Sequence, residues 1–152
     1  MTLRILLAGV GVRGRHWAEV LTRNPDCKIV AYADPNADAL AHIKARYGAA
    51  PTFDSAEAAL ASLGADEVDA LLLANPPLGR ASQLRAAAER KIPVLVEKPL
   101  ALDLHEAAEL VKIAEDADIS LMVGLNFRYL AVTKATMQLL ADNTVGQAAF
   151  GR

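Results

Sequence analysis

Short apolar runs alternate along the chain with longer segments in which apolar residues recur at every third or fourth position. The apolar runs predict strands, which lie at residues 3–8, 28–33, 69–74, 93–96 and 120–124, with a weaker candidate at 51–53. Several of these runs are apolar on both faces, as is typical of parallel strands that helices cover on either side. The alternation therefore predicts an α/β fold built on a parallel sheet with right-handed crossovers.

Two of the predicted helices carry an apolar stripe that would face the sheet. In the first, Trp17, Val20 and Leu21 are spaced at i, i+3 and i+4. In a later helix, the residues expected on one face are Leu104, Ala107, Leu110, Val111 and Ala114. A last helix is predicted over roughly 129–141.

Acidic residues mark the starts of two helices. Asp54 precedes Glu57 by three positions, and Asp103 precedes Glu106 by the same spacing. Each pair resembles a capping box, in which the first side chain accepts a hydrogen bond from a free N–H group of the helix. We therefore expect Asp54 and Asp103 to be N-cap residues.

Composition narrows the class of protein. The chain has 152 residues, 53% hydrophobic and 22% charged, with a formal net charge of −2. These values suit one domain with a sizeable core and disfavour nucleic-acid binding. The single cysteine, Cys27, cannot form an internal disulfide, and no apolar run is long enough to cross a bilayer, so we expect a cytoplasmic protein. His16, His42 and His105 are scattered and predict no metal site.

Three glycines follow the first predicted strand with the spacing G-x-G-x-x-G. Gly9 would permit a tight turn, Gly11 would let a pyrophosphate approach the backbone, and Gly14 would let helix and strand pack closely. A helix that begins near Val12 would offer free N–H groups to the phosphates. By itself the motif is also compatible with a plain glycine-rich turn.

An acidic residue at the end of the second strand strengthens the dinucleotide hypothesis. Asp34 lies 20 residues after Gly14, where a carboxylate can accept hydrogen bonds from the hydroxyls of an adenosine ribose. It can also open a turn with Pro35 and Asn36, and the two roles are compatible. Strand, glycines, helix and Asp34 together favour dinucleotide binding.

Two arginines in the glycine turn bear on the choice between NAD and NADP. Arg13 could reach a pyrophosphate or, less often, a 2′-phosphate, and both Arg13 and Arg15 could instead be solvated charges. Residues 35–38 offer no Lys, Arg or Ser to a 2′-phosphate, and the carboxylate of Asp34 would repel one. We therefore expect NAD, with NADP the minority alternative.

Lys98 follows the fifth predicted strand, between Glu97 and Pro99. At the carboxyl end of a central parallel strand it would point toward the crevice in which such sheets bind ligands. There its amine could hydrogen-bond a substrate hydroxyl or exchange a proton with it. From the tripeptide alone, a surface turn with a solvated ion pair is the better interpretation, and the position after a strand in a nucleotide-binding pattern is what favours the functional one.

An ordered set of motifs extends over essentially the whole chain: GVGVRG, YADPN, LLLANPP, VLVEKPLA and VGLNFRY. In order and spacing this set resembles the glucose–fructose oxidoreductase, inositol dehydrogenase and MocA family of NAD(P)-dependent oxidoreductases. The resemblance implies a Rossmann-type doubly wound parallel sheet with helices on both faces and strand order 3-2-1-4-5-6. It also implies hydride transfer between a nicotinamide and a carbinol carbon of a sugar, cyclitol or related polyol.

The resemblance further implies roles for individual residues. The three glycines would cradle the pyrophosphate, and Asp34 would bind the adenosine ribose. The residues implied to surround the nicotinamide half of the cofactor are Asn75, Pro76, Glu97, Lys98, Asn126 and Arg128. Among these, Lys98 would be the catalytic group, and its bond to Pro99 is expected to be cis.

The chain departs from the family pattern in three respects. Arg80 stands where the family usually has histidine, and Leu130 stands near the place of a common proline. Residues 1–144 would form the NAD(P)-binding domain, and residues 145–152 would begin a substrate domain that is cut short. In the family that domain supplies an acidic residue, a histidine and the interface of a homo-oligomer, so the fragment alone is expected to be inactive.

Two other functions are compatible with parts of the sequence. A non-catalytic NAD-binding module that senses the cofactor would need the glycine turn and Asp34 but not Lys98. A methyltransferase also uses a glycine-rich turn and an acidic residue after the second strand, but it leaves the Glu97–Pro99 turn unexplained.

Overall fold

The computed structural model describes residues 2–48 and 50–147. Its strands are β1 (Leu3–Ala8), β2 (Cys27–Ala33), β3 (Thr52–Phe53), β4 (Ala70–Leu73), β5 (Val94–Val96) and β6 (Leu121–Val123). Its helices are α1 (Val12–Thr22), α2 (Ala37–Tyr47), α3 (Ala56–Ser62), α4 (Arg80–Glu89), α5 (Leu104–Asp116) and α6 (Ala131–Ala141), with a 3₁₀ helix η1 (Asn126–Tyr129). The six predicted strands are thereby confirmed.

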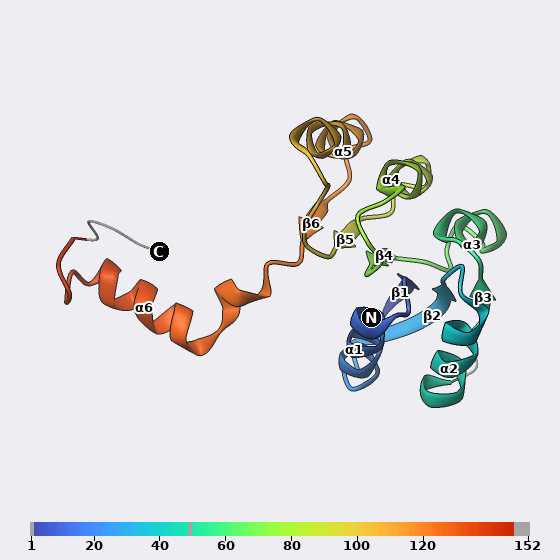
Figure 1. Ribbon diagram of the computed structural model, residues 1–152, viewed down its shortest axis with the longest axis horizontal. Coiled ribbons are helices and arrows are strands. Elements are labelled where there is room, and N and C mark those ends of the chain that lie inside the picture. Colours follow the sequence, from blue (N-terminus) through green and yellow to red (C-terminus); the bar gives the residue numbers. More distant parts are fainter. Residues whose placement is uncertain (1, 49, 148–152) are drawn as a thin grey trace.

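The strands form one parallel sheet in the order β3-β2-β1-β4-β5-β6, which confirms the predicted Rossmann-type topology. Helices α1 and α2 cover one face of the sheet, and α3, α4 and α5 cover the other (Figure 1). The two halves of the sheet meet between β1 and β4, and the chain passes from the first half to the second through α3, which connects β3 to β4. Parallel sheets of this kind bind ligands beyond the carboxyl ends of the strands at that switch point.

Apolar side chains of neighbouring strand positions enter two different cores. Ile5 and Leu7 of β1 pack with the α1 and α2 side, whereas Leu6 and Ala8 pack with the α3, α4 and α5 side. Since side chains of a strand alternate between its faces, a strand covered on both sides must be apolar throughout. This is the physical reason for the continuous apolar runs in the sequence.

Two of the predicted helix stripes are wrong in part. Val20 is 46% exposed, and the inner face of α1 consists of Gly14, Ala18 and Leu21, with Trp17 half-buried. On α5 the buried residues are Leu110, Ile113 and Ala114, whereas Leu104 and Val111 are exposed. The spacing of apolar residues does not determine how far a helix is rotated about its axis, and so which of them face the sheet. For α1 this rotation is determined by the close packing of the glycine turn.

The helix starts give one confirmation and one correction. Asp103 caps α5, because its carboxylate accepts a hydrogen bond from Glu106 N–H at 2.8 Å, and Glu106 accepts one from Leu102 N–H. Helix α3 is capped by Ser55 and not by Asp54, since the Ser55 hydroxyl accepts the N–H of Ala58. Serine caps as well as aspartate does, so a neighbouring pair of capping residues cannot be ranked from sequence alone.

The last predicted helix, roughly 129–141, is confirmed as α6 (Ala131–Ala141), and a short 3₁₀ helix precedes it. Residues 126–129 form η1, Leu130 follows in an extended conformation, and α6 then extends away from the sheet (Figure 1). Along α6 several apolar side chains are exposed, namely Val132, Met137, Leu139 and Leu140. The strand predicted at 145–152 falls mostly outside the described residues. In the part of the chain that the structure describes, no helix has the length and apolar character needed to cross a membrane.

An ion pair fastens the start of β1 to the residue before β4. Asp69 accepts hydrogen bonds from the Arg4 backbone N–H at 2.8 Å and from Arg4 Nε and Nη2 at 2.9 and 2.6 Å. These hydrogen bonds from Arg4 lower the pKa of Asp69 to about 2. A carboxyl whose pKa is lowered by folding stabilises the protein above its unfolded pKa of about 3.9, and this contribution is lost as the pH falls toward 2.

Replacing Asp69 by asparagine is therefore expected to lower the melting temperature at neutral pH. The difference from the unsubstituted protein should shrink between about pH 4 and pH 2, where the native carboxyl becomes protonated. Thermal unfolding followed by circular dichroism across this range measures it. Asp26→Asn, at an exposed aspartate before β2, is the control and should change little. A difference for Asp69→Asn that stays constant down to pH 2 would contradict the assignment.

Candidate functional site

A cavity of about 680 Å³ lies beyond the carboxyl ends of β1, β2 and β4, at the switch point of the sheet. The predicted residues that line it are Gly9, Gly11, Val12, Arg13, Asp34, Asn75 and Pro76. Residues that sequence reasoning did not assign to it come from the starts of α3 and α4 and include Asp54, Ser55, Glu57, Ser82 and Gln83. They follow β3 and β4, so the predicted strand ends were the signal that could have found them.

The glycine turn is packed against the backbone on one side and open on the other. Gly9 has φ +83°, and a Cβ there would lie 2.4 Å from the backbone nitrogen of Asn75. A Cβ on Gly14 would lie 1.8 Å from the carbonyl oxygen of Gly9. A Cβ on Gly11 would meet nothing within 4 Å, and this glycine lines the cavity. Gly9 and Gly14 are thus required by the fold, whereas Gly11 leaves space for a ligand.

The start of α1 offers unpaired N–H donors at the same place. The N-cap Gly11 provides no side-chain hydrogen bond, and the first turn carries no acidic residue. Arg15 N–H bonds to the Gly11 carbonyl, so the preceding N–H groups of Val12, Arg13 and Gly14 have no acceptor within the helix. An uncapped helix N-terminus beside an open glycine suits a phosphate or pyrophosphate group.

Asp34 stabilises the turn at the carboxyl end of β2. Its Oδ2 accepts the backbone N–H of Val10 at 2.8 Å, and its Oδ1 accepts that of Asn36 at 2.9 Å. The predicted turn with Pro35 and Asn36 is therefore present, and the same carboxylate also holds the glycine turn. Because each oxygen can accept more than one hydrogen bond, this arrangement leaves acceptor capacity toward the cavity.

Glu97 joins the glycine turn to the segment after β5. It is only 4% exposed, and its Oε1 accepts hydrogen bonds from Arg13 Nε and Trp17 Nε1, both at 2.7 Å. The Arg13 guanidinium also lies 5.8 Å from the centre of the Trp17 ring. Arg13 is thus paired with a buried carboxylate. Arg15 faces a separate cavity of about 290 Å³ between α1 and α2.

Lys98 is exposed directly after Glu97, at the carboxyl end of β5. The Lys98–Pro99 peptide bond is cis, as expected. Lys98 does not line the 680 Å³ cavity. It belongs to the same edge of the sheet, and the Arg13–Glu97 ion pair connects its turn to the glycine turn.

Asn75 presents an unsatisfied polar atom at the end of β4. Its Nδ2 donates to Gln83 Oε1 at 3.1 Å, whereas its buried Oδ1 has no hydrogen-bond partner among the described residues. Buried polar atoms are normally paired, so a lone amide oxygen beside a cavity suits a ligand that brings a donor. A dinucleotide fits three features together: the free space beside Gly11, the uncapped N-terminus of α1 and the unpaired Oδ1 of Asn75.

Arg80, the first residue of α4, is 1% exposed. Its guanidinium donates to the carbonyl oxygens of Asn75 at 3.0 Å, Leu100 at 2.8 Å and Pro99. Burial lowers its pKa, while the charges of Glu106 and Glu97 act in the opposite direction. The sequence identified Arg80 only as a departure from the family pattern, because nothing local indicates that an arginine is buried.

Asn126 and Arg128 are not brought into this cavity. Both lie on η1, are exposed, and are absent from the residues that line the cavity. The helix that follows, α6, extends away from the sheet, so η1 has no neighbour in the described chain that would turn these two side chains inward (Figure 1).

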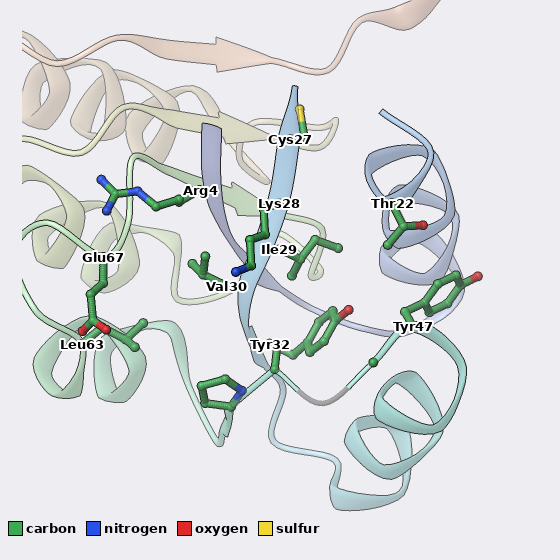
Figure 2. A pocket seen from close by; sticks show the side chains of 13 residues that line it. Arg4, Thr22, Cys27, Lys28, Ile29, Val30, Tyr32, Tyr47, Leu63 and Glu67 are labelled. Atoms are coloured by element: carbon green, nitrogen blue, oxygen red, sulfur yellow. The ribbon is translucent and has the colours of Figure 1, made fainter. Parts of the chain in front are cut away.

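A second, larger cavity of about 860 Å³ lies along β2, where side chains from Cys27 to Tyr32 line it (Figure 2). It is lined by the first half of β2 and by residues such as Arg4, Tyr32, Tyr47 and Glu67. Burial raises the pKa of the Tyr32 hydroxyl. Its size does not make it the functional site, because none of the described residues that line it belongs to the glycine turn or to the segments after the carboxyl ends of the strands.

Comparison with known proteins agrees with the geometry of this site. Residues 3–125 match a family described as "Oxidoreductase family, NAD-binding Rossmann fold". The chain is 30% identical over 148 residues to inositol 2-dehydrogenase from Rhizobium meliloti (strain 1021). This alignment covers 97% of this chain and 43% of that protein. It is 31% identical over 135 residues to D-xylose 1-dehydrogenase (NADP(+)) 2 from Haloferax volcanii. This alignment covers 89% of this chain and 40% of that protein.

Solved structures give the same result. An oxidoreductase from Agrobacterium radiobacter, determined in complex with NAD+, L-tartaric acid and magnesium, superposes with a TM-score of 0.89 at 26% identity. The alignment covers 97% of this chain and 42% of that one, so the chain spans less than half the length of the relatives it matches. The chain belongs to the oxidoreductase family with the NAD-binding Rossmann fold, and it is the nucleotide-binding domain of that family.

Proposed function

We propose that this domain orients NAD for hydride transfer to or from a carbinol carbon of a sugar, cyclitol or related polyol. The observation that carries the proposal is the 2.7 Å ion pair between Arg13 and Glu97, which links the glycine turn to the Lys98 turn at one edge of the sheet. A module that only binds a cofactor needs the first turn and has no use for the second. The substrate class is supported by relatives named for inositol and D-xylose.

In this proposal the chain binds and orients the cofactor along the carboxyl ends of the strands. The N–H groups at the start of α1 would hold the pyrophosphate over Gly11, and Asp34 would accept hydrogen bonds from the adenosine ribose. Asn75 and Pro76 would lie beside the nicotinamide half. Glu97 would face the nicotinamide ribose. Asn126 and Arg128 lie outside the 680 Å³ cavity, so in this proposal they would approach the cofactor only at its nicotinamide end.

Lys98 would act as the general acid and base for the substrate hydroxyl. When bound, the nicotinamide cofactor supplies the hydride acceptor or donor. During oxidation of the substrate, the amine of Lys98 would accept the proton of the carbinol hydroxyl, and during reduction its ammonium would return it. Because Lys98 is exposed at the end of β5, its side chain can reach a substrate without rearrangement of the sheet.

NAD rather than NADP is the proposed cofactor. Asp34, Asp54 and Glu57 line the cavity, and its one cationic lining residue, Arg13, is paired with Glu97. A 2′-phosphate would thus meet carboxylates without a free cation in the described lining, which is unfavourable. A relative carries NADP(+) in its name, so the proposal of NAD rests on this chain's own residues.

Exchanging Asp34 for serine is expected to weaken NADH binding about tenfold, since a charge-assisted hydrogen bond to the ribose is lost. Binding of NADPH should weaken less than binding of NADH, because loss of the Val10 hydrogen bond affects both cofactors whereas the repulsion of the 2′-phosphate is relieved only for NADPH. Titration of cofactor fluorescence measures both constants. Asp26→Asn, at the amino end of β2, is the control; tighter binding of NADPH than of NADH by the unsubstituted chain would overturn the choice of NAD.

Residues 145–152 are proposed to lead into a second domain that completes the substrate site and forms a homo-oligomer. Support comes from the apolar side chains that α6 leaves exposed, and from relatives more than twice as long as the chain. We place the enzyme in the cytoplasm, because a single cysteine suits a reducing compartment.

The decisive test is an assay of the full-length polypeptide that carries this chain with NAD and a panel of inositols, aldoses and other polyols. NADH formation with at least one of them is the expected result. Tight NADH binding without turnover on any of the panel would favour the non-catalytic NAD-binding module instead.

A further inference from the structure

Two charged side chains are buried among the described residues, and both contact the segment around Lys98. Glu97 precedes Lys98 and is held by Arg13 and Trp17 of α1. Arg80 belongs to α4 and donates to the carbonyl oxygens of Pro99 and Leu100, which follow Lys98. Since α1 and α4 cover opposite faces of the sheet, the Lys98 turn is held from both sides (Figure 1).

Arg80 also reaches a second turn. Its Nη2 donates to the carbonyl oxygen of Asn75 at 3.0 Å, and the Asn75 side chain donates to Gln83 of the same helix. One guanidinium thus connects the segment after β4 to the segment after β5. A planar guanidinium presents several donors in a fixed fork, so it sets the relative position of the carbonyl groups that it binds.

The position is unfavourable for an arginine by ordinary rules. It is buried, and no carboxylate among the described residues lies within salt-bridge distance of it. It is the first residue of a helix, where the dipole disfavours a positive charge, and its Nε has no hydrogen-bond partner among the described residues. Violations of local rules are expected at functional sites, where the gain lies in the geometry that they maintain.

We propose that Arg80 is a positioning residue, which sets the Lys98 turn relative to the Asn75 turn and on which the rate of hydride transfer depends. The inference rests on the proposed function and extends it to a residue that touches neither substrate nor cofactor. Reactions that need close alignment lose rate steeply when a reacting group is displaced by about 1 Å, so a small shift of the turn is sufficient.

The first arm of the test measures the turn itself and needs no activity. Arg80→Lys keeps the positive charge but replaces the planar guanidinium by a single ammonium group. Arg85→Lys makes the same change at an exposed arginine of the same helix. In two-dimensional amide NMR spectra, Arg80→Lys is expected to shift the signals of Asn75, Lys98 and Leu100. Arg85→Lys should leave them in place. A folded Arg80→Lys variant with unshifted signals would overturn the proposal.

The second arm measures the reaction in the full-length enzyme. Arg80→Lys should lower the single-turnover rate of hydride transfer about 10- to 100-fold, while the dissociation constant of NADH changes by less than about threefold. A rate that is unchanged, or that falls only in proportion to the folded fraction, would overturn the proposal. Arg80→His is the second variant, because the family usually has histidine here. Failure of both variants to fold would also overturn it, since the role would then be structural.

The two proposals can fail separately. If the unsubstituted enzyme oxidises no polyol, the proposed function is contradicted, and the amide signals alone decide whether Arg80 sets the turn. If it turns over and the Arg80 variants do so equally well, the proposed function stands and the positioning role is wrong.

Discussion

Replacing Lys98 by alanine in the full-length enzyme is expected to lower kcat by about 10²- to 10⁴-fold, the usual contribution of a general acid or base. The affinity for NADH should change by less than about threefold, because the groups proposed to hold the pyrophosphate and the adenosine ribose lie in the glycine turn, at the start of α1 and directly after β2. Lys98 is exposed and makes no side-chain hydrogen bond among those found in the described chain, so its removal leaves no buried group unpaired. Single-turnover kinetics and cofactor fluorescence measure the two quantities.

Lys112→Ala is the matched control for this substitution. Lys112 is an exposed lysine on α5 that pairs with Asp116, and its loss should change neither kcat nor the affinity for NADH. Turnover by Lys98→Ala at the unsubstituted rate would remove Lys98 from the mechanism. A parallel loss of NADH affinity and kcat would instead assign to Lys98 a role in cofactor binding.

Alanine at Gly14 and at Gly11 is expected to act on two different properties. At Gly14 the added Cβ would lie 1.8 Å from the carbonyl oxygen of Gly9, and neither backbone can move without separating α1 from β1. Overpacking of this kind is expected to reduce the free energy of unfolding by about 3 kcal/mol. At Gly11 the Cβ would enter open space, so stability should change by no more than about 1 kcal/mol.

For cofactor binding, the larger direct effect is expected from Gly11→Ala, the variant whose stability changes least. Gly11→Ala places a methyl group where a pyrophosphate would approach the start of α1, and should weaken NADH binding about tenfold or more in a fully folded protein. Denaturant unfolding and NADH titration test the pair. Full NADH affinity in Gly11→Ala would contradict the cradle, and an unchanged free energy of unfolding in Gly14→Ala would contradict the close packing of α1 on β1.

The fold was predictable because its signals are local. Strands buried on both faces must be apolar throughout, and the glycine turn and Asp103 cap carry their chemistry in a few neighbouring residues. Errors arose where two local solutions have similar free energies, as with Ser55 beside Asp54, or where the rotation of a helix depends on packing, as with Val20.

The site was only partly predictable. Sequence spacing located Gly11, Asp34 and Asn75 at the ends of strands, and the structure brings all three to one cavity. Sequence spacing did not assign Ser55 and Gln83 to the same cavity, because they follow different strands, β3 and β4, whose ends come together only in the folded sheet. Asn126 and Arg128 stay outside it in the described chain.

By itself the sequence determined the order of strands and helices, the glycine turn and the presence of Lys98 after a buried strand. Tertiary structure decided how the charged residues are used. Arg13 meets Glu97 across 84 residues of sequence, and Arg80 binds carbonyl groups 19 and 20 residues away. Such contacts depend on which strands become neighbours and on how deeply each side chain is buried, and no local period along the chain encodes either property.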